Sequence, residues 1–203
     1  MFEFKERYDI NDLIAIMKIL RSENGCPWDK VQTHESIRTD LIEEAYEVCE
    51  GIDCNSPGML REELGDLLLQ IAFHSQIETE AGNFNFDDVC NDICQKLVYR
   101  HPHVFGEVKV SGSDDVLKNW DALKKESKHQ DTYSETLESV PRTFPALLRG
   151  EKICKRASRA GLPINDAKAF ADRIRHGLDE LEQSGFAAEN AHNSELMGDL
   201  LLS

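Results

Sequence analysis

Apolar residues recur every three or four positions along most of the chain, as they do on one face of an α-helix. Capping and stop signals divide this pattern into five predicted helices. Ser56 and Pro57, for example, stand where an N-cap and a first helical residue belong. The predicted helices run over residues 9–23 (capped by Asp9 or Asn11), 33–53 (capped by Thr33), 56–81, 87–100, and from 113 past Lys124. Because only residues 108–110 alternate as a strand would, the pattern predicts an all-α fold, a bundle of four to five helices.

Carboxylates gather beside the apolar stripes of the second and third predicted helices. The stripes contain Ile37, Leu41, Ala45, Val48 and Ile52 on one helix and Leu60, Leu64, Leu67, Leu68 and Ile71 on the other. Glu43, Glu44 and Glu47 lie roughly 110° from the centre of the first stripe. Glu63 and Asp66 lie about 120° from the second, on the same side. If the helices pack antiparallel through these stripes, all but Glu43 approach a common point.

Carboxylates crowded in this way repel one another unless a cation lies among them, and Mg²⁺ is a hard ion that takes such oxygen ligands. The alternative is a solvated acidic face. A solvated acidic face would be stabilised by Lys or Arg partners one turn away. Such partners are few, because residues 35–66 contain ten Asp or Glu and only two Arg. A di-iron bundle would need Glu-x-x-His pairs, which neither helix carries. His74 lies eight residues beyond Asp66 and is interpreted as a packing residue.

The composition narrows the possible partners. A net charge of −15 and a pI near 4.8 argue against nucleic-acid or anionic-membrane binding, which needs clustered Lys and Arg. The six cysteines form no CxxC pair, which favours reduced structural thiols over a disulfide frame or a zinc site. No signal peptide or apolar run of about 20 residues is present, so we expect a cytoplasmic protein.

The chain also repeats part of its own pattern. A shift of 133 residues places residues 65–69 on the identical residues 198–202 and Glu47 on Glu180. This predicts a complete module over residues 1–126, a polar linker or mobile loop over 127–145, and the start of a second module over 146–203. At the second module's site only Glu180 and Asp199 remain acidic, because His176, Gly177 and Leu196 replace the other positions. The abrupt stop at Ser203, in mid-helix by pattern, favours a shortened second module.

Several motifs together resemble the MazG nucleoside triphosphate pyrophosphohydrolases. They are Gly25-Cys26-Pro27-Trp28-Asp29-Lys30, Gln32-Thr33, Arg100-His101-Pro102-His103-Val104-Phe105, and the EExxE and ExxD pattern at Glu43, Glu44, Glu47, Glu63 and Asp66. The resemblance covers essentially the whole chain. It implies an all-α NTP pyrophosphatase fold, a homodimer, and hydrolysis of a nucleoside triphosphate to the monophosphate and pyrophosphate with Mg²⁺, or Mn²⁺ in its place, as cofactor.

The resemblance also assigns roles to individual residues. Glu44, Glu47, Glu63 and Asp66 take the place of the metal ligands, and Glu43 could orient or deprotonate the attacking water or support a ligand. Lys96 with Arg100, and Trp120 with Lys124, match positions that contact the nucleotide. Trp28 and Lys30 complete the candidate substrate-binding set; either tryptophan could stack on a base or anchor the core.

Three functions remain open at this stage. The first is a Mg²⁺-dependent pyrophosphohydrolase of canonical or damaged nucleotides that works from the first module. The second is a catalytically impaired nucleotide-binding or dimerisation module, which the eroded second site suggests. The third is a pyrophosphatase of narrower specificity, acting on a substrate such as dUTP or phosphoribosyl-ATP, because base selectivity depends on a pocket shape that spacing does not give.

Overall fold

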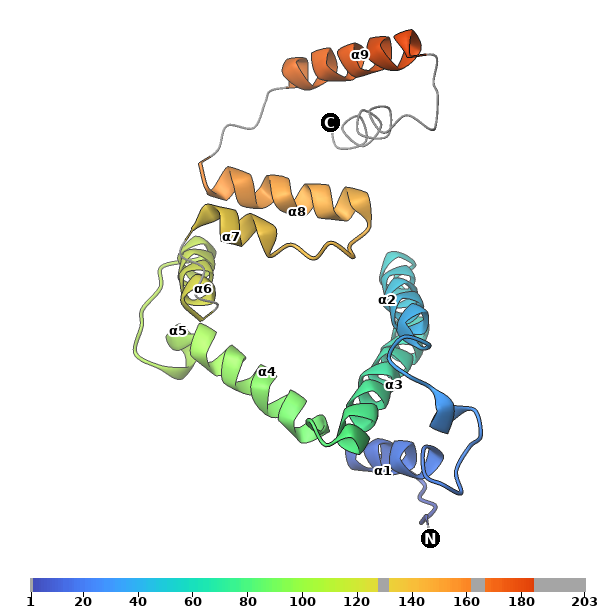
Figure 1. Cartoon of the computed structure of the whole chain (residues 1–203). Coiled ribbons are helices and arrows are strands. Elements are labelled where there is room, and N and C mark those ends of the chain that lie inside the picture. Colours follow the sequence, from blue (N-terminus) through green and yellow to red (C-terminus); the bar gives the residue numbers. More distant parts are fainter. Residues whose placement is uncertain (1, 128–131, 162–166, 185–203) are drawn as a thin grey trace. The chain divides into compact units, whose positions relative to one another are not determined.

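The computed structural model describes residues 2–127, 132–161 and 167–184. The described residues form helices joined by turns and loops, with no β-strand among them (Figure 1). The chain divides into two compact units, Met1–Tyr99 and Arg100–Ser203, and each is described by itself. Within the described ranges, no helix has both the length and the apolar character that a membrane crossing requires.

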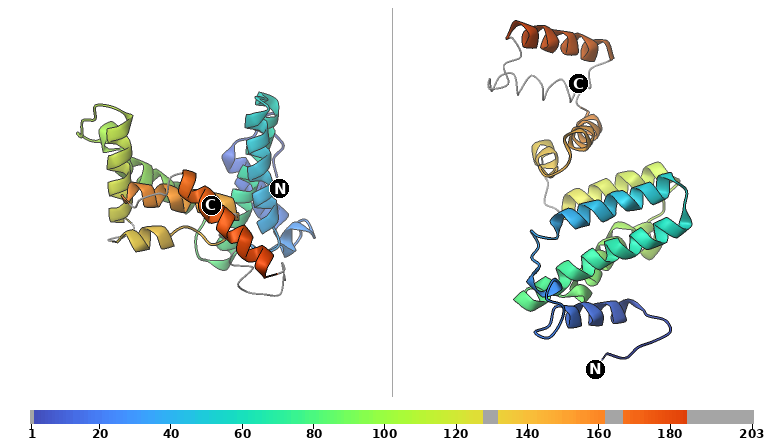
Figure 2. Two further views of the ribbon diagram at one scale, coloured as in Figure 1. Left: turned by 90° about the horizontal axis from the view of Figure 1, so that it is seen from above. Right: turned by 90° about the vertical axis from the view of Figure 1, so that its right-hand side faces the viewer.

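The first unit is built around a pair of adjacent antiparallel helices, α2 and α3 (Figure 2). Its elements are α1 (Ile10–Leu20), the 3₁₀ helix η1 (Asp29–Val31), α2 (Arg38–Asp53), α3 (Pro57–Ala81) and α4 (Phe86–Arg100), whose last residue belongs to the second unit. α1 packs against α3 beside the pair. The predicted helices are therefore present, and the all-α prediction is confirmed for the described residues.

Local signals account for the ends of α1 and α3. The side chain of Asp9 accepts hydrogen bonds from the backbone of Asn11 and Asp12, and Asp12 bonds back to the Asp9 backbone, which completes a capping box. Ser56 caps α3 with its hydroxyl. α3 ends at Gly82, which has a φ of 76°, a left-handed conformation that glycine adopts without a Cβ clash. These capping predictions are confirmed.

The predicted start of the second helix at Thr33 is wrong. Thr33 and Ser36 bond each other through hydroxyl and backbone groups, as in a capped first turn. However, Ile37 has a φ of −100° and a ψ of 9°, which is outside helical geometry, so the turn does not run on into a helix. α2 begins at Arg38 without a side-chain cap. The sequence placed a capped turn correctly but not the break that follows it.

The core of the first unit is small and lies between α1, the turn before α2, and α3. It consists of Met17, Ile37, Ala72 and Phe73, with partly buried apolar neighbours around them. The predicted stripes are only partly buried. Ala45, Ile52, Leu64 and Ile71 are exposed in this chain, because nothing in the first unit covers that side of α2 and α3.

The second unit contains five further helices among its described residues. They are α5 (Pro102–Phe105), α6 (Ser113–Ser127), α7 (Tyr133–Glu138), α8 (Ala146–Arg159) and α9 (Ala167–Gln183). α7 packs against α8, and Arg156 holds the end of α7 by hydrogen bonds to the Thr136 carbonyl and the Ser139 hydroxyl. A capped helix therefore lies inside the stretch that the sequence predicts to be a linker, because Thr132 and Glu135 form a capping box.

The predicted second module is described only in part. His176, Gly177 and Glu180 lie on α9, where His176 and Glu180 are one turn apart and 3.4 Å from each other. Leu196, Asp199 and residues 200–203 lie outside the described residues. The repeat and the domain boundaries drawn from it stay predictions.

Candidate functional site

The acidic residues lie where α2 and α3 run side by side. The two helices are joined by residues 54–56 alone, which forces them into an antiparallel hairpin. Gly51 is buried at this end of the hairpin, and a Cβ there would lie 3.0 Å from the Leu60 backbone nitrogen. The missing side chain allows the two backbones to approach closely. Carboxylates on the facing sides of the helices are brought together as a result.

Three of the four predicted ligands converge. Glu44 of α2 and Glu63 and Asp66 of α3 each offer a carboxylate oxygen, and these oxygens all lie within 4.8 Å of one another. All three side chains are half-buried. Among the described residues this is the one group of three or more potential ligand side chains with such a spacing. The geometry agrees with the helical-wheel prediction for these three residues.

Glu47 and Glu43 differ in their relation to this group. Glu47 is hydrogen-bonded to the side chains of both Glu44 and Glu63, so it lies at the edge of the cluster, one helical turn from Glu44. A hydrogen bond between two carboxyl groups requires a proton on one of them. Glu43 is exposed on α2 and is not among the three converging residues.

The cluster carries uncompensated negative charge. Burial raises the pKa of Glu44 above its usual value, and the charges of Asp66, Glu47 and Glu63 raise it further. Burial likewise raises the pKa of Glu63, with added repulsion from Glu47, Glu62 and Asp66. No Lys or Arg contributes to either shift. A hard divalent cation is the kind of partner that would relieve this repulsion, because it binds several carboxylate oxygens at once.

The predicted nucleotide-binding residues at the start of the second unit form a cluster of their own. The Arg100 guanidinium is buried, lies 5.4 Å from the centre of the Trp120 ring, and donates a hydrogen bond of 3.1 Å to the Ser127 hydroxyl. His101 meets the same ring edge-on, with 4.9 Å between ring centres. Lys124 follows one turn after Trp120 on α6 and is half-buried. Trp120 therefore has packing partners within its own unit.

The remaining predicted contacts belong to the first unit. Lys96 is exposed on α4, one turn before Arg100. Trp28 is 57% exposed, although its ring meets Phe73 edge-on at 6.5 Å. The Lys30 ammonium donates a 3.3 Å hydrogen bond to the carbonyl of Glu23, which ties the two ends of the loop together. The structure thus brings the carboxylates to one point, while these three residues do not join that cluster in any described contact.

Comparison with known proteins gives the chain its family. Residues 32–105 match the MazG nucleotide pyrophosphohydrolase domain. The chain is 40% identical over 197 residues to the nucleoside triphosphate pyrophosphohydrolase of Escherichia coli strain K12, covering 96% of this chain and 75% of that protein. It is also 40% identical over 192 residues to the nucleoside triphosphate pyrophosphohydrolase/pyrophosphatase MazG of Thermotoga maritima, covering 95% and 72%. The chain belongs to the MazG family.

A third relative matches a smaller part of the chain. The uncharacterized protein YabN of Bacillus subtilis strain 168 is 47% identical over 148 residues, covering 73% of this chain and 30% of that protein.

The MazG domain match contains the whole of the α2–α3 hairpin and ends at Phe105, so it includes all five predicted acidic residues. MazG proteins are hydrolases that act on acid anhydrides, and the chain is an enzyme of this class.

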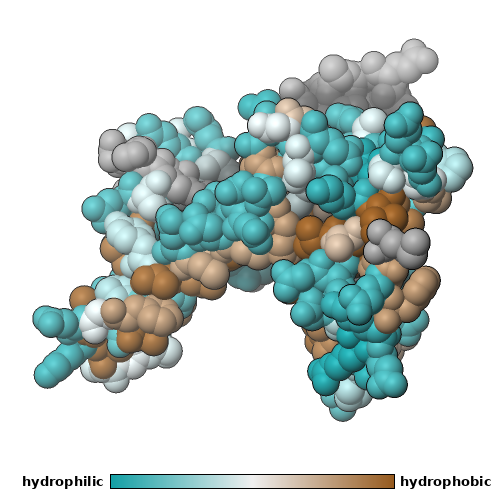
Figure 3. All heavy atoms as spheres, turned by 90° about the horizontal axis from the view of Figure 1, so that it is seen from below, coloured by the Kyte–Doolittle hydropathy of each residue, from teal (hydrophilic) through white to brown (hydrophobic). Residues whose placement is uncertain are grey.

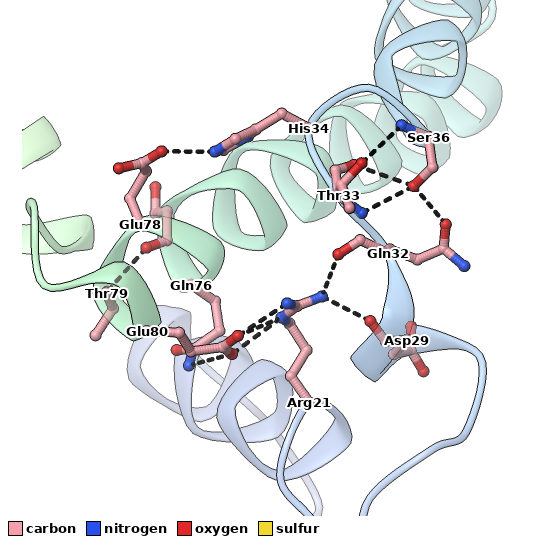
Figure 4. Close-up of polar contacts among 11 residues, drawn as sticks. Arg21, Asp29, Gln32, Thr33, His34, Ser36, Gln76, Glu78, Thr79 and Glu80 are labelled. Atoms are coloured by element: carbon pink, nitrogen blue, oxygen red, sulfur yellow. Dashed lines mark hydrogen bonds and ion pairs between the residues drawn. The ribbon is translucent and has the colours of Figure 1, made fainter.

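Sequence reasoning missed two sets of contacts that attach the segment before α2, residues 29–34, to α3 (Figure 4). Arg21, at the end of α1, binds both oxygens of Glu80 and donates hydrogen bonds to the carbonyls of Asp29 and Gln32. In the turn just before α2, the side chain of His34 is hydrogen-bonded to the side chains of Glu78 and His74 on α3. No periodicity reports the contacts with α3, because these partners are separated by 40 to 59 positions in the sequence.

Proposed function

We propose that this protein hydrolyses nucleoside triphosphates to nucleoside monophosphates and pyrophosphate in a Mg²⁺-dependent reaction, using the carboxylates of its first module. The observation that carries the proposal is the convergence of Glu44, Glu63 and Asp66 within 4.8 Å. The names of the E. coli and T. maritima relatives support the same activity.

The donor set suits Mg²⁺. It consists of carboxylate oxygens alone, and burial together with the charges of neighbouring carboxylates raises the pKa of both Glu44 and Glu63. Mg²⁺ is bound in proteins through a few carboxylates together with water and substrate phosphate oxygens. Glu44, Glu63 and Asp66 would hold the ion, and Glu47 would contribute directly or through its contact with Glu63. When bound, the ion supplies a positive charge that polarises a phosphoryl oxygen and favours attack by water.

The chain's own residues would perform the remaining tasks. Glu43, exposed and adjacent to Glu44, would accept the proton of the attacking water or orient it. Lys96 would neutralise charge that develops on the leaving pyrophosphate, and Trp28 would offer a ring face to the base. The family resemblance assigns substrate contacts to Arg100, Trp120, Lys124 and Lys30 as well.

A second copy of the chain is the partner that best explains the exposed apolar side of α2 and α3. Ile42, Tyr46 and Leu64 are 46%, 59% and 49% exposed, and Ile71 is 39% exposed. The same region carries the stripe that the sequence predicts to be buried. Hydrophobic residues are also exposed in patches on the face of the molecule shown in Figure 3. Several exposed apolar side chains on two adjacent helices are typical of an interaction surface, so we propose a homodimer formed through the α2–α3 hairpin.

Direct measurement of pyrophosphate release tests the activity. The full chain is incubated with each NTP, with dUTP and with phosphoribosyl-ATP, in the presence of Mg²⁺ or of a chelator. We expect Mg²⁺-dependent release that Glu44→Ala and Asp66→Ala abolish. Glu50→Ala removes an exposed carboxylate of the same helix and should leave the rate unchanged. Release that persists in both cluster variants would reject the proposed site.

Two further outcomes separate the alternatives. Nucleotide binding without any product would support a catalytically impaired binding module. Turnover confined to dUTP or phosphoribosyl-ATP would identify a pyrophosphatase of narrower specificity. Sedimentation of the full chain and of a Leu64→Glu variant tests the dimer. We expect the charge on this apolar face to convert a dimer into a monomer.

A further inference from the structure

The amide of Gln70 is buried, and its oxygen has no hydrogen-bond partner. Gln70 lies on α3 and is only 8% exposed. Its carbonyl oxygen, Oε1, is buried and makes no hydrogen bond within the described part of the chain. Most buried polar groups in proteins are paired, because an unpaired buried acceptor destabilises the folded state. Gln70 therefore serves a purpose other than the stability of the metal-free chain.

A second glutamine of the same helix shows the usual arrangement. Gln76 is also 8% exposed, and its amide nitrogen donates a hydrogen bond of 3.0 Å to Glu80. The same carboxylate binds Arg21, so the amide of Gln76 belongs to the contacts that join α1 to α3. The fold thus gives one buried amide of α3 a partner and leaves the oxygen of the other without one.

Gln70 borders the carboxylate cluster. It follows Asp66 by four residues and Glu63 by seven, so it lies about 40° and about 20° from them around the axis of α3. Long side chains in a helix lean toward its N-terminus and cover the turn before their own. For Gln70 this is the turn that carries Asp66. The end of the Gln70 side chain therefore lies at the border of the cluster.

A hydrated cation in the cluster would supply the missing donor. Glu44, Glu63 and Asp66 offer three ligands, whereas Mg²⁺ is octahedral and keeps several waters in protein sites. A water bound to a cation through its oxygen turns its hydrogens outward, so it donates hydrogen bonds and needs acceptors. The Oε1 atom of Gln70 is such an acceptor, and it adds no charge to carboxylates that already repel one another. The terminal torsion of glutamine is broad, so the oxygen can turn toward the cluster.

We propose that Gln70 is a positioning residue for the carboxylate site: its Oε1 atom accepts a hydrogen bond from a water bound to the divalent cation. Gln70 itself does not touch the cation. The inference rests on the proposed function in taking the carboxylates to bind a divalent cation. It adds to the site a neutral residue that lies outside the acidic motif, and binding of the cation offsets the cost of the buried oxygen.

A different partner for the oxygen would give a different result. The Nε2 atom of His74, one turn further along α3, is also buried without a partner among the described residues. A water held between this nitrogen and Gln70 would pair the oxygen without any cation. Removal of the amide would then destabilise the metal-free protein, because the rest of the bridge would lose a partner.

Two measurements on the full chain test the role of Gln70. Urea unfolding in the presence of a chelator reports on the metal-free protein, and Gln70→Leu should raise the midpoint because it removes the unpaired oxygen. Binding of Mn²⁺, which takes the same oxygen ligands as Mg²⁺, is followed by electron paramagnetic resonance. We expect Gln70→Leu to bind Mn²⁺ about tenfold more weakly, the low end for losing a group that orients the ligands of a metal site.

Gln76→Leu is the matched control. It removes an equally buried amide that has a partner, so it should lower the urea midpoint and leave the affinity for Mn²⁺ unchanged. Opposite effects of the two substitutions on stability, with a loss of affinity in Gln70→Leu alone, are the expected result. Equal affinity for Mn²⁺ in Gln70→Leu and the unmodified protein, or a lower urea midpoint of Gln70→Leu in the chelator, would overturn the positioning role.

The exchange of water on the bound ion separates a hydrogen bond from packing. Relaxation of solvent ¹⁷O reports how fast water exchanges on Mn²⁺, and exchange should be faster in Gln70→Leu because the acceptor that holds one of these waters is gone. Weaker binding with unchanged exchange would mean that Gln70 acts by packing alone, which would also overturn the proposal. Failure of the unmodified protein to bind Mn²⁺ would reject the proposed function and this inference with it.

Discussion

Arg21 offers the sharpest test of what holds the first unit together. Its side chain is 5% exposed, and its guanidinium lies 5.2 Å from the centre of the Phe73 ring. It donates at 2.6 Å to the carbonyl of Asp29 and at 3.1 Å to that of Gln32. It also binds Glu80 through two nitrogens at 2.9 and 2.8 Å. One side chain thus fastens α1, the loop and α3 to one another.

The expected loss follows from these contacts. Arg21→Met keeps most of the apolar stem and removes every hydrogen bond. The two bonds from a charged donor to backbone carbonyls contribute about 1.5 kcal/mol each. The ion pair adds only about 1 kcal/mol, because the Glu80 side chain is 38% exposed and solvent screens the pair. We therefore expect the free energy of unfolding to fall by about 4 kcal/mol, and by about half as much for Arg21→Lys, which keeps the charge but not the planar fork.

Tryptophan fluorescence can report on this unit alone. The chain has two tryptophans, and in a Trp120→Phe background Trp28 is the single reporter, packed against Phe73 within the first unit. Urea unfolding of the Arg21 variants in this background gives the free-energy differences. Arg61→Met changes an exposed arginine of α3 and should cost less than about 0.5 kcal/mol. If Arg21→Met lowers the free energy of unfolding by less than about 1 kcal/mol, Arg21 does not hold α1, the loop and α3 together.

Three further predictions concern the first unit. Because the folded-state pKa of Glu63 is raised, its ionisation as the pH rises above about 4.5 destabilises the metal-free protein. Urea unfolding in the presence of a chelator at pH 7 should therefore find Glu63→Gln more stable than the unmodified protein, and the difference in the free energy of unfolding should vanish as the pH falls to about 4. Glu50→Gln is the matched control. A Glu63→Gln protein less stable than the unmodified protein would contradict the repulsion. Asp9→Ala removes the capping box of α1 and should cost about 1 kcal/mol in the same experiment, whereas an unchanged midpoint would show that the cap contributes nothing. Gln70→Leu replaces a buried amide whose oxygen lacks a partner, so we expect stability to rise by about 1 kcal/mol; a fall would mean that the amide is bonded.

The sequence predicted those features that depend on neighbours along the chain. The cap at Ser56, the stop at Gly82 and the acidic side of α2 and α3 all follow from local signals and a period of 3.6 residues. The start of α2 could not be placed, because a hydroxyl cap at Thr33 looks the same in sequence whether or not the backbone breaks at Ile37. Periodicity alone reported the approximate direction of Glu44 and Asp66 but not their separation.

Features that depend on distant partners escaped prediction. The hydrogen bonds of His34 to His74 and Glu78, and the ion pair of Arg21 with Glu80, join segments that only the folded chain brings together. The stripe residues Ile52 and Leu64 were expected in a core, and in the single chain they are exposed. Periodicity shows which side of a helix is apolar, but it does not show whether the same chain or a second copy covers that side.

The short connection between α2 and α3 also bears on how the protein folds. A helical hairpin closed by residues 54–56 has local contacts, and local contacts form early and fast. We therefore expect Glu44, Glu63 and Asp66 to meet while much of the chain is still unfolded, so that their repulsion opposes the first step of folding rather than the last. The acidic cluster would then slow folding in the absence of a cation. Divalent cation in the refolding buffer should raise the folding rate more than it lowers the unfolding rate.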